Sequence, residues 1–459
     1  MSSEQKSHLQ DGKSLEEWLC YLETIHKTEI ELGLSRISKV AQRLSVDLSF
    51  ATVITVAGTN GKGTTCAFLE NALLKEYQHN DDTRPHLSVA VYSSPHIERF
   101  NERLRIDHKD VDDIAFIRAF EQIELARADI SLSYYEFTTL AAFLVLMATK
   151  PDVIILEVGL GGRLDATNII DADVAVITSV DIDHQAFLGN VRETIGFEKA
   201  GIMRADQNIV IGDLVPPMSV LKRANEINQT LVAEKIPQAL AKIKVREKDF
   251  TIVEAINTDN AQGLWHWQCH EQVMGEQNTF QLEQLIPTNI PRDNVVTALM
   301  VLKQLGFTLT SEKVNQLIEQ TKVAGRTEMF KDTCDVMLDV GHNPHAGRYL
   351  AKQLNSLKAQ KGYTKVIAIT AMLADKDIKN TLLSLAQSVD EWYIAPLEVP
   401  RAASTEYMRE AVNEFTPAIN CFDNVTQAFK IASQNAKATD LILVFGSFFT
   451  VAEIRKLLI

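Results

Sequence analysis

The chain of 459 residues is 46% hydrophobic, which allows large buried cores and, at about 150 residues per domain, two or three domains. Its 46 basic and 60 acidic residues give a net charge of −14, which argues against nucleic acid or an anionic membrane as the main partner. An anionic substrate would therefore need a locally positive site.

Neither export nor a membrane span is indicated by the apolar pattern. The polar start of the chain, Met1 to Ser14, lacks the apolar core of a signal peptide, so we expect a cytoplasmic protein. The longest apolar stretch, residues 137–149, lies between Glu136 and Lys150 and is shorter than the roughly 20 residues that a span requires. It is predicted to form a buried helix.

Short β-branched apolar runs alternate with segments long enough for crossover helices, which is typical of a parallel α/β sheet. The runs of the first part are residues 53–57, 87–92, 153–158 and 174–178. Residues 250–255 and 265–269 flank a polar stretch and predict an antiparallel hairpin appended to this sheet. In residues 265–269 the alternation places Trp265, Trp267 and Cys269 on one face.

A second α/β alternation follows a helix that begins near Asn294. Its apolar runs are residues 336–339, 366–370, 392–395 and 441–444. The fold class is therefore α/β. A P-loop-containing parallel-sheet domain over residues 1–322 is followed by a smaller Rossmann-like domain over residues 323–459.

A phosphate loop is indicated by Gly-Thr-Asn-Gly-Lys-Gly-Thr-Thr at residues 58–65, between an apolar strand and a helical pattern. Such glycines let backbone N–H groups converge on phosphate oxygens, and Lys62 adds a full positive charge to the helix N-terminus. The hydroxyl of Thr64 or Thr65 can reach a magnesium ion. The strict phosphate-loop pattern is not met, because Val56 replaces the first glycine and Gly63 the hydroxyl residue. The structural alternative is a glycine-rich turn that only caps a helix.

Three candidate metal ligands follow predicted strands. Glu157 lies at the C-terminal end of the run 153–158, Ser94 follows the run 87–92, and His184 follows a later strand. Ligands of open α/β sheets bind at the carboxyl ends of the strands. Magnesium prefers oxygen ligands, so His184 taken alone indicates a turn histidine.

The phosphate loop resembles that of the Mur ligase superfamily, and the extra Gly63 resembles its folylpolyglutamate synthase branch. Further matching motifs are Ser93-Ser94-Pro95-His96, residues 157–168, residues 198–202, and Asp339-Val340-Gly341-His342-Asn343-Pro344. The resemblance runs from Trp18 to about Val451, and it implies a Mur ligase-like fold with ATP and Mg²⁺ as cofactors.

The resemblance also implies the roles of individual residues. The implied ATP-binding residues are Thr59, Asn60, Gly61, Lys62, Gly63, Thr64, Asn294, Arg326 and Asp339. The implied metal ligands are Ser94, Glu157 and His184, and the implied catalytic residues are Lys62, Lys199 and His342. Lys199 is implied to be carbamylated, since a free lysine amine with a reference pKa of about 10.4 would repel magnesium. The alternative for Lys199 is an ordinary surface lysine in a charged helix.

For the substrate, the resemblance implies a pocket for the pterin group of dihydropteroate. Its residues are Glu29, Ile30, Glu31, Leu32, Ser133, Tyr134, Tyr135, Glu136, Leu164, Asp165 and Ala166. Tyr135 is expected to stack on the pterin and Glu31 to accept its ring N–H groups. The family commonly has aspartate where Glu31 stands. Trp18 and Tyr21 are expected to pack in the core.

The predicted function is an ATP-dependent ligase that joins L-glutamate to dihydropteroate and adds glutamates to reduced folates through an acyl phosphate. Its partners would be dihydropteroate, reduced folates and L-glutamate, without nucleic acid or membrane, and the resemblance implies a monomer. The smaller domain is expected to close over ATP and bind glutamate. The alternatives are a folylpolyglutamate synthase only, a P-loop kinase, or a non-catalytic nucleotide-binding protein.

Overall fold

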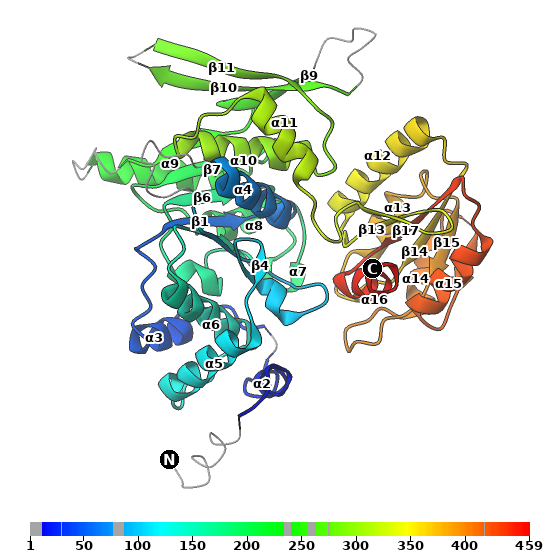
Figure 1. The fold of residues 1–459 in the computed structure, drawn as a ribbon, viewed down its shortest axis with the longest axis horizontal. Coiled ribbons are helices and arrows are strands. Elements are labelled where there is room, and N and C mark those ends of the chain that lie inside the picture. Colours follow the sequence, from blue (N-terminus) through cyan, green and yellow to red (C-terminus); the bar gives the residue numbers. More distant parts are fainter. Residues whose placement is uncertain are drawn as a thin grey trace. The chain divides into compact units, whose positions relative to one another are not determined.

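The computed structural model describes residues 12–28, 30–76, 87–233, 240–254, 263–273, 276–416 and 418–459. The chain divides into two compact units (Figure 1). The first unit consists of Met1–Val180, Arg192–Pro287 and Pro291–Gln320. The second consists of Asp181–Val191, Thr288–Ile290 and Thr321–Ile459, so two short segments belong to it before its continuous part begins.

An eight-stranded sheet with the order β4-β3-β2-β5-β1-β6-β7-β8 forms the centre of the first unit. Its strands are β1 (Thr52–Ala57), β2 (Val89–Tyr92), β3 (Leu104–Ile106), β4 (Lys109–Asp110), β5 (Val153–Glu157), β6 (Val174–Ile177), β7 (Asn208–Ile211) and β8 (Lys242–Val245). The six neighbouring strands β2, β5, β1, β6, β7 and β8 are parallel to one another. Strands β3 and β4 add an antiparallel edge beside β2. The predicted parallel sheet and its four predicted strands are confirmed.

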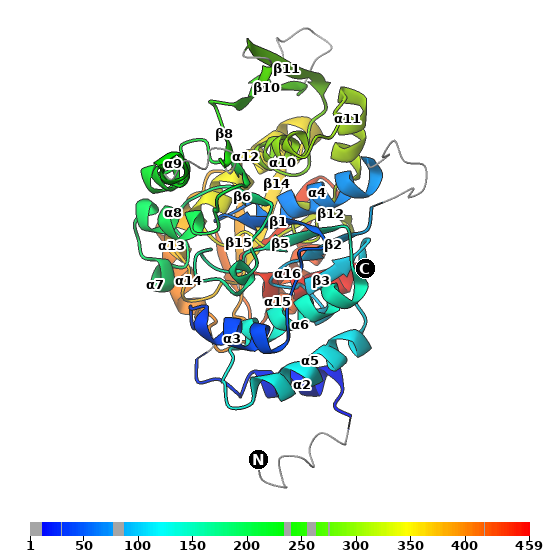
Figure 2. The same cartoon turned by 90° about the vertical axis from the view of Figure 1, so that its left-hand side faces the viewer.

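Helices cover both faces of this sheet. They are α2 (Leu15–Leu22), α3 (Ser35–Arg43), α4 (Lys62–Glu76), α5 (Asp113–Arg127), α6 (Tyr134–Thr149), α8 (Arg192–Ala200), α9 (Met218–Ala233), α10 (Arg292–Gln304) and α11 (Ser311–Gln320), with short 3-10 helices η1 (Phe100–Arg103) and η2 (Ala166–Ile169). Figure 2 shows α4 and α10 on one face and α3, α5 and α6 on the other.

The predicted buried helix over residues 137–149 is confirmed as α6. Phe137, Leu140 and Phe143 are fully buried in the core, and Trp18 packs into the same cluster, as expected. Continuous apolar residues bury this helix on most sides. Within the described ranges, no helix is both long enough and apolar enough to cross a membrane.

The predicted hairpin is part of a separate sheet. Strands β9 (Phe250–Glu254), β10 (Trp265–Val273) and β11 (Glu276–Leu285) are antiparallel in the order β11-β10-β9. The predicted antiparallel pairing of β9 with β10 is confirmed. The prediction that this hairpin extends the main sheet is wrong, because β10 pairs with β9 on one edge and with β11 on the other, within a separate small sheet. Trp265, Trp267 and Cys269 are fully buried, as the alternation predicts. Most of the connection, residues 255–262, lies outside the described residues.

The second unit has a six-stranded sheet with the order β12-β13-β17-β14-β15-β16. Its strands are β12 (Glu328–Lys331), β13 (Asp335–Asp339), β14 (Lys365–Thr370), β15 (Glu391–Ile394), β16 (Ile419–Cys421) and β17 (Asp440–Phe445). Its helices are α7 (Gln185–Leu188), α12 (Pro344–Lys361), α13 (Ile378–Leu383), α14 (Thr405–Asn413), α15 (Val425–Asn435) and α16 (Phe448–Leu458). All neighbours are parallel except β12, so the predicted α/β class is confirmed.

Candidate active site

The phosphate loop joins β1 to α4 and is held by the residues that follow β6. The N–H of Thr59 donates to the carbonyl of Ser179 at 2.7 Å, and the hydroxyl of Thr178 donates to the carbonyl of Asn60 at 2.7 Å. A Cβ atom on Gly58 would lie 1.9 Å from the Thr178 hydroxyl oxygen. Only glycine fits there, so the loop lies directly against the end of β6.

Asn294, on α10, lies against the other side of this loop. Its Nδ2 donates to Thr64 Oγ1 at 2.6 Å, and a Cβ atom on Gly61 would lie 2.3 Å from its Oδ1. Gly61 also has a φ of 88°, which favours glycine. The ammonium of Lys62 donates to the carbonyl of Gly58 at 3.0 Å. The structure thus brings Asn294 to the residues predicted to bind ATP.

Glu157 reaches the first turn of α4 from the end of β5. A Cβ atom on Gly63 would lie 3.7 Å from Glu157 Oε2, and Glu157 is only 6% exposed. In the same turn, Thr65 Oγ1 is buried and has no hydrogen-bond partner among the described residues. Carboxylate and hydroxyl oxygens are the ligands that Mg²⁺ prefers, so this donor set fits a magnesium-bound nucleotide.

Ser94 lies beside residues of the predicted pterin pocket. Burial raises the pKa of the Tyr135 hydroxyl well above its usual value, and the negative charge of Asp165 raises it further. Interaction with the Ser94 side chain lowers this pKa, so Ser94 lies close to the Tyr135 hydroxyl. The Tyr135 ring stacks on Tyr92 with centroids 6.3 Å apart. A Cβ atom on Gly159 would lie 2.7 Å from Tyr135 Cζ, so the ring rests on the backbone after β5.

Asp165 is buried in the turn that follows. It accepts the N–H of Leu160 at 2.8 Å and the hydroxyl of Thr167 at 2.7 Å. Burial raises its pKa, although these hydrogen bonds oppose the shift. Ala166 is also buried, whereas Leu164 is partly exposed. Asp165 therefore shapes the loop and places a carboxylate near Tyr135.

Lys199 is buried at the end of α8, with 3% of its surface exposed. A Cβ atom on Gly162 would lie 3.1 Å from Lys199 Cα, and the N–H of Arg163 donates to the carbonyl of Glu198 at 2.7 Å. The loop after β5 therefore packs directly on this helix end. The surface-lysine alternative is wrong, because an exposed lysine would not be enclosed in this way.

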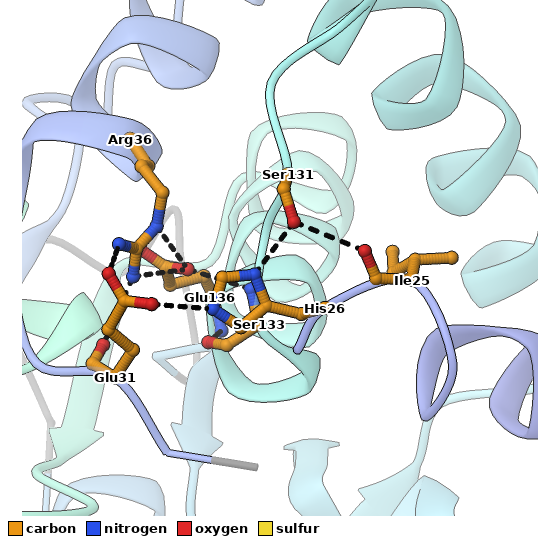
Figure 3. A network of polar contacts seen from close by, with 7 residues as sticks. All are labelled: Ile25, His26, Glu31, Arg36, Ser131, Ser133 and Glu136. Atoms are coloured by element: carbon orange, nitrogen blue, oxygen red, sulfur yellow. Dashed lines mark hydrogen bonds and ion pairs between the residues drawn. The ribbon is translucent and has the colours of Figure 1, made fainter. Parts of the chain in front are cut away.

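Figure 3 shows the polar network around Glu31. His26 Nε2 lies 2.9 Å from Glu31 Oε2, and Arg36 forms an ion pair with the other oxygen. A hydrogen bond from His26, followed by the charge of Arg36, lowers the pKa of Glu31. Of the neighbouring predicted residues, Glu29 lies outside the described residues, and Ile30 and Leu32 are partly exposed.

Arg36 also joins this network to the start of α6 (Figure 3). Its Nη2 donates to Glu136 Oε2 at 3.2 Å, and the same oxygen accepts the N–H of Ser133 at 2.8 Å. Glu136 and Ser133 form a capping box that begins the helix. Tyr134 is partly buried below the guanidinium of Arg103. Sequence reasoning missed Arg36, because a single arginine on an amphipathic helix gives no signal.

In the second unit, Asp339 ends β13 and is 5% exposed. It accepts the N–H groups of Thr327 at 2.9 Å and Gly341 at 2.7 Å. Burial raises its pKa, and the charge of Arg326 opposes the shift. The guanidinium of Arg326 lies 5.5 Å from the ring centroid of Phe448. Asp339 and Arg326 are therefore close enough to interact.

His184 belongs to the second unit, whereas Ser94 and Glu157 belong to the first. His184 precedes α7 in a left-handed conformation, and its neighbour Asp183 is bound by Lys376 at 2.8 Å and Asn343 at 3.0 Å. Sequence reasoning missed Asp183 and Lys376. The only signal for Asp183 in the sequence was its position directly before His184, a predicted metal ligand.

Asp183 also lies close to the predicted catalytic residue His342. Asp183 Oδ2 lies 3.6 Å from His342 Nε2, and His342 Nδ1 lies 2.8 Å from the carbonyl of Val340. Burial opposes ionisation of Asp183, but the hydrogen bond and charge of His342, with the charge of Lys376, hold its pKa well below the usual range. The segment that carries His184 is thus anchored through an ionised carboxylate.

Comparison with known proteins identifies the family. Residues 56–278 match the Mur ligase middle domain, and residues 325–448 match the Mur ligase glutamate ligase domain. The chain is 39% identical over 449 residues to the dihydrofolate synthase/folylpolyglutamate synthase of Escherichia coli (strain K12), which covers 98% of this chain and 96% of that one.

Solved structures agree with this match. E. coli FolC in complex with DHPP and ADP has a TM-score of 0.83 at 39% identity, over 97% of both chains. The bifunctional folylpolyglutamate synthase/dihydrofolate synthase of Yersinia pestis, complexed with AMPPNP and Mn ion, has a TM-score of 0.83 at 42% identity, over 97% of this chain and 98% of that one. The chain therefore belongs to the dihydrofolate synthase/folylpolyglutamate synthase family of Mur ligases.

Proposed function

We propose that this protein is an ATP- and Mg²⁺-dependent ligase that joins L-glutamate to dihydropteroate and extends reduced folates with further glutamates. The observation that carries the proposal is the phosphate loop, with Lys62 at the start of α4 and the Glu157 carboxylate beside Gly63. The names and bound ligands of the E. coli and Y. pestis relatives support the same activity.

The reaction must first make a carboxylate reactive. A carboxylate oxygen of the substrate attacks the γ-phosphorus of ATP, ADP leaves, and an acyl phosphate forms. The amine of L-glutamate then attacks the acyl carbon, the amide bond forms, phosphate leaves, and the amine loses a proton. Mg²⁺, when bound, neutralises charge on the phosphates. Lys62 and the N–H groups of the phosphate loop hold the phosphates in position.

The remaining site residues are proposed to act in separate groups. Ser94, Glu157 and His184 would hold the metal, and a carbamylated Lys199 would support it with a carboxylate. From the second unit, Arg326 would bind phosphate with its planar fork of donors, Asp339 would contact ATP, and His342 would assist catalysis. Residues 323–459 would also bind glutamate.

The pterin group is proposed to bind near Tyr135, between the start of α6 and the loop after β5. The ring of Tyr135 would stack on the pterin, and Asp165 and Glu31 would accept its N–H groups. His26 and Arg36 keep Glu31 ionised, so it can act only as an acceptor. We further propose that the protein works as a cytoplasmic monomer without nucleic acid or membrane partners.

Phosphate release from ATP tests the proposal. The purified protein should release phosphate only when Mg²⁺, L-glutamate and dihydropteroate, or a reduced folate, are present together. ADP formation without phosphate release would identify a kinase, and nucleotide binding without turnover would identify a non-catalytic protein. Activity with reduced folates but not with dihydropteroate would leave a folylpolyglutamate synthase only. Lys62→Met is the control, since it removes the charge while keeping a long side chain.

A further inference from the structure

A buried ion pair ties β3 to the helix that follows the phosphate loop. Glu70 is only 2% exposed, and its Oε2 lies 2.8 Å from Arg105 Nη2. Glu70 is two turns after Lys62 on the same face of α4, with buried Cys66 between them. A buried carboxylate is stable only when it is paired, so Arg105 fixes α4 at this point.

The other arm of the same guanidinium reaches the loop of a predicted metal ligand. Arg105 Nη1 lies 3.5 Å from both Ser93 Oγ and the carbonyl oxygen of Glu102. Ser93 directly precedes Ser94, and its N–H donates to the carbonyl of Arg103 at 2.8 Å. One planar side chain therefore spans the gap between α4 and the segment that carries Ser94.

We propose that Arg105 is a positioning residue that sets the distance between the phosphate loop and Ser94. The two arms of the guanidinium are rigidly connected, so a shift of α4 is transmitted to Ser93. A lysine carries the same charge but has no planar fork, and it would satisfy Glu70 alone. The inference rests on the proposed function, because Ser94 matters to the reaction only if it binds the metal of the nucleotide.

Binding of a fluorescent ADP analogue, titrated with Mg²⁺, measures this role without turnover. Arg105→Lys is expected to raise the Mg²⁺ concentration for half-maximal binding about 10-fold, as is typical when support for a metal ligand is lost. Binding of the analogue without Mg²⁺ should stay unchanged, because the phosphate loop remains intact. Arg105→Met should show at least the same loss. The control is Arg99→Met, which removes an exposed ion pair with Asp110.

The outcomes separate the alternatives. An Arg105→Lys variant that needs the same Mg²⁺ concentration as the wild type would overturn the inference. Tighter Mg²⁺ binding in Arg105→Met would also overturn it, because the positive charge of Arg105 would then be its only effect on the metal. An equal loss of binding with and without Mg²⁺ would show general damage and would also overturn it. Arg105→Lys retains the buried ion pair, so the test remains valid if Arg105→Met does not fold. Failure of the wild-type protein to bind the analogue would instead contradict the proposed function.

Discussion

The side-chain amide of Asn294 donates a 2.6 Å hydrogen bond to the hydroxyl of Thr64. Asn294 is on α10 and Thr64 is in the first turn of α4, so a distant part of the sequence shapes the phosphate loop. Asn294→Ala should raise the KM for ATP about 10-fold, because a buried hydrogen bond of about 1.5 kcal/mol is lost. Steady-state kinetics with varied ATP measure this.

Arg292→Ala is a matched control for this prediction. Arg292 is on the same helix, but it pairs with Glu254 in a partly exposed contact. Its replacement should leave the KM for ATP unchanged. Equal effects of the two replacements would mean that Asn294 acts through the stability of α10 and not through the loop.

Gly159→Ala should weaken binding of dihydropteroate. The new Cβ atom would lie 2.7 Å from Tyr135 Cζ, so the ring must move away from its position on the loop. We expect the KM for dihydropteroate to rise about 10-fold, the usual effect of losing one aromatic contact, while the KM for ATP stays unchanged. In a Tyr135→Ala background the same glycine replacement should have little further effect. Additive effects would show that the two residues are not coupled.

Lys199 should carry the added mass of one carbon dioxide in the native protein. The residue is only 3% exposed, and the carbamate would replace its buried ammonium with a carboxylate that can support a metal. Native mass spectrometry of protein kept in bicarbonate should detect the adduct. Lys199→Ala should lower kcat about 100-fold, as expected for lost support of a metal ligand, and short-chain carboxylates should restore part of it. Full activity in Lys199→Ala would contradict the carbamate.

Asp335 should make the second unit sensitive to acid. The pKa of Asp335 is lowered from 3.8 to about 2, chiefly by the hydrogen bond from Tyr363. Burial opposes this shift, and hydrogen bonds from Lys331 and Lys361 add to it. Since the folded pKa lies below the unfolded value, the carboxylate stabilises the fold above pH 3.8 and loses this effect as the pH falls towards 2.

Asp335→Asn should therefore lower the free energy of unfolding at neutral pH by about 2 kcal/mol, which appears as a lower Tm. It should also reduce the fall of Tm between about pH 4 and pH 2. Differential scanning calorimetry over this pH range measures both effects. Asp332→Asn replaces an exposed carboxylate nearby and serves as the control. The same pH slope in wild type and Asp335→Asn would show that this carboxylate does not contribute.

Most of the strands that sequence analysis predicted are buried, although the buried strand β7 was not predicted and the predicted strand β9 is partly exposed. Residues 441–444 form a continuous apolar run, and residues 53–57 form one that is interrupted only by the buried Thr55, because both faces of a parallel sheet are covered. In contrast, β12 and β16 are edge strands with partly exposed side chains, so their pattern resembles that of a loop. Their strand structure comes from pairing with β13 and β15, which no local pattern reveals.

The candidate site was also predicted only in part. The phosphate loop could be identified from its own residues, because glycines, lysine and helix stand in one continuous stretch. Asn294 and Lys199 were found only through the family resemblance, since neither lies in a distinctive local pattern. Arg36, Arg105 and Lys376 could not be predicted, because each acts through a partner brought close only by the fold.

Assignment of Asp181–Val191 to the second unit affects how the chain acquires its structure during synthesis. This segment emerges from the ribosome well before Lys376, the cation that pairs with its buried Asp183. Asp183 can therefore form this ion pair only after the chain has been synthesised through Lys376, well after β6 and β7, the strands on either side of the segment in sequence. For the same reason, the two units cannot be separated by cutting the chain at one peptide bond.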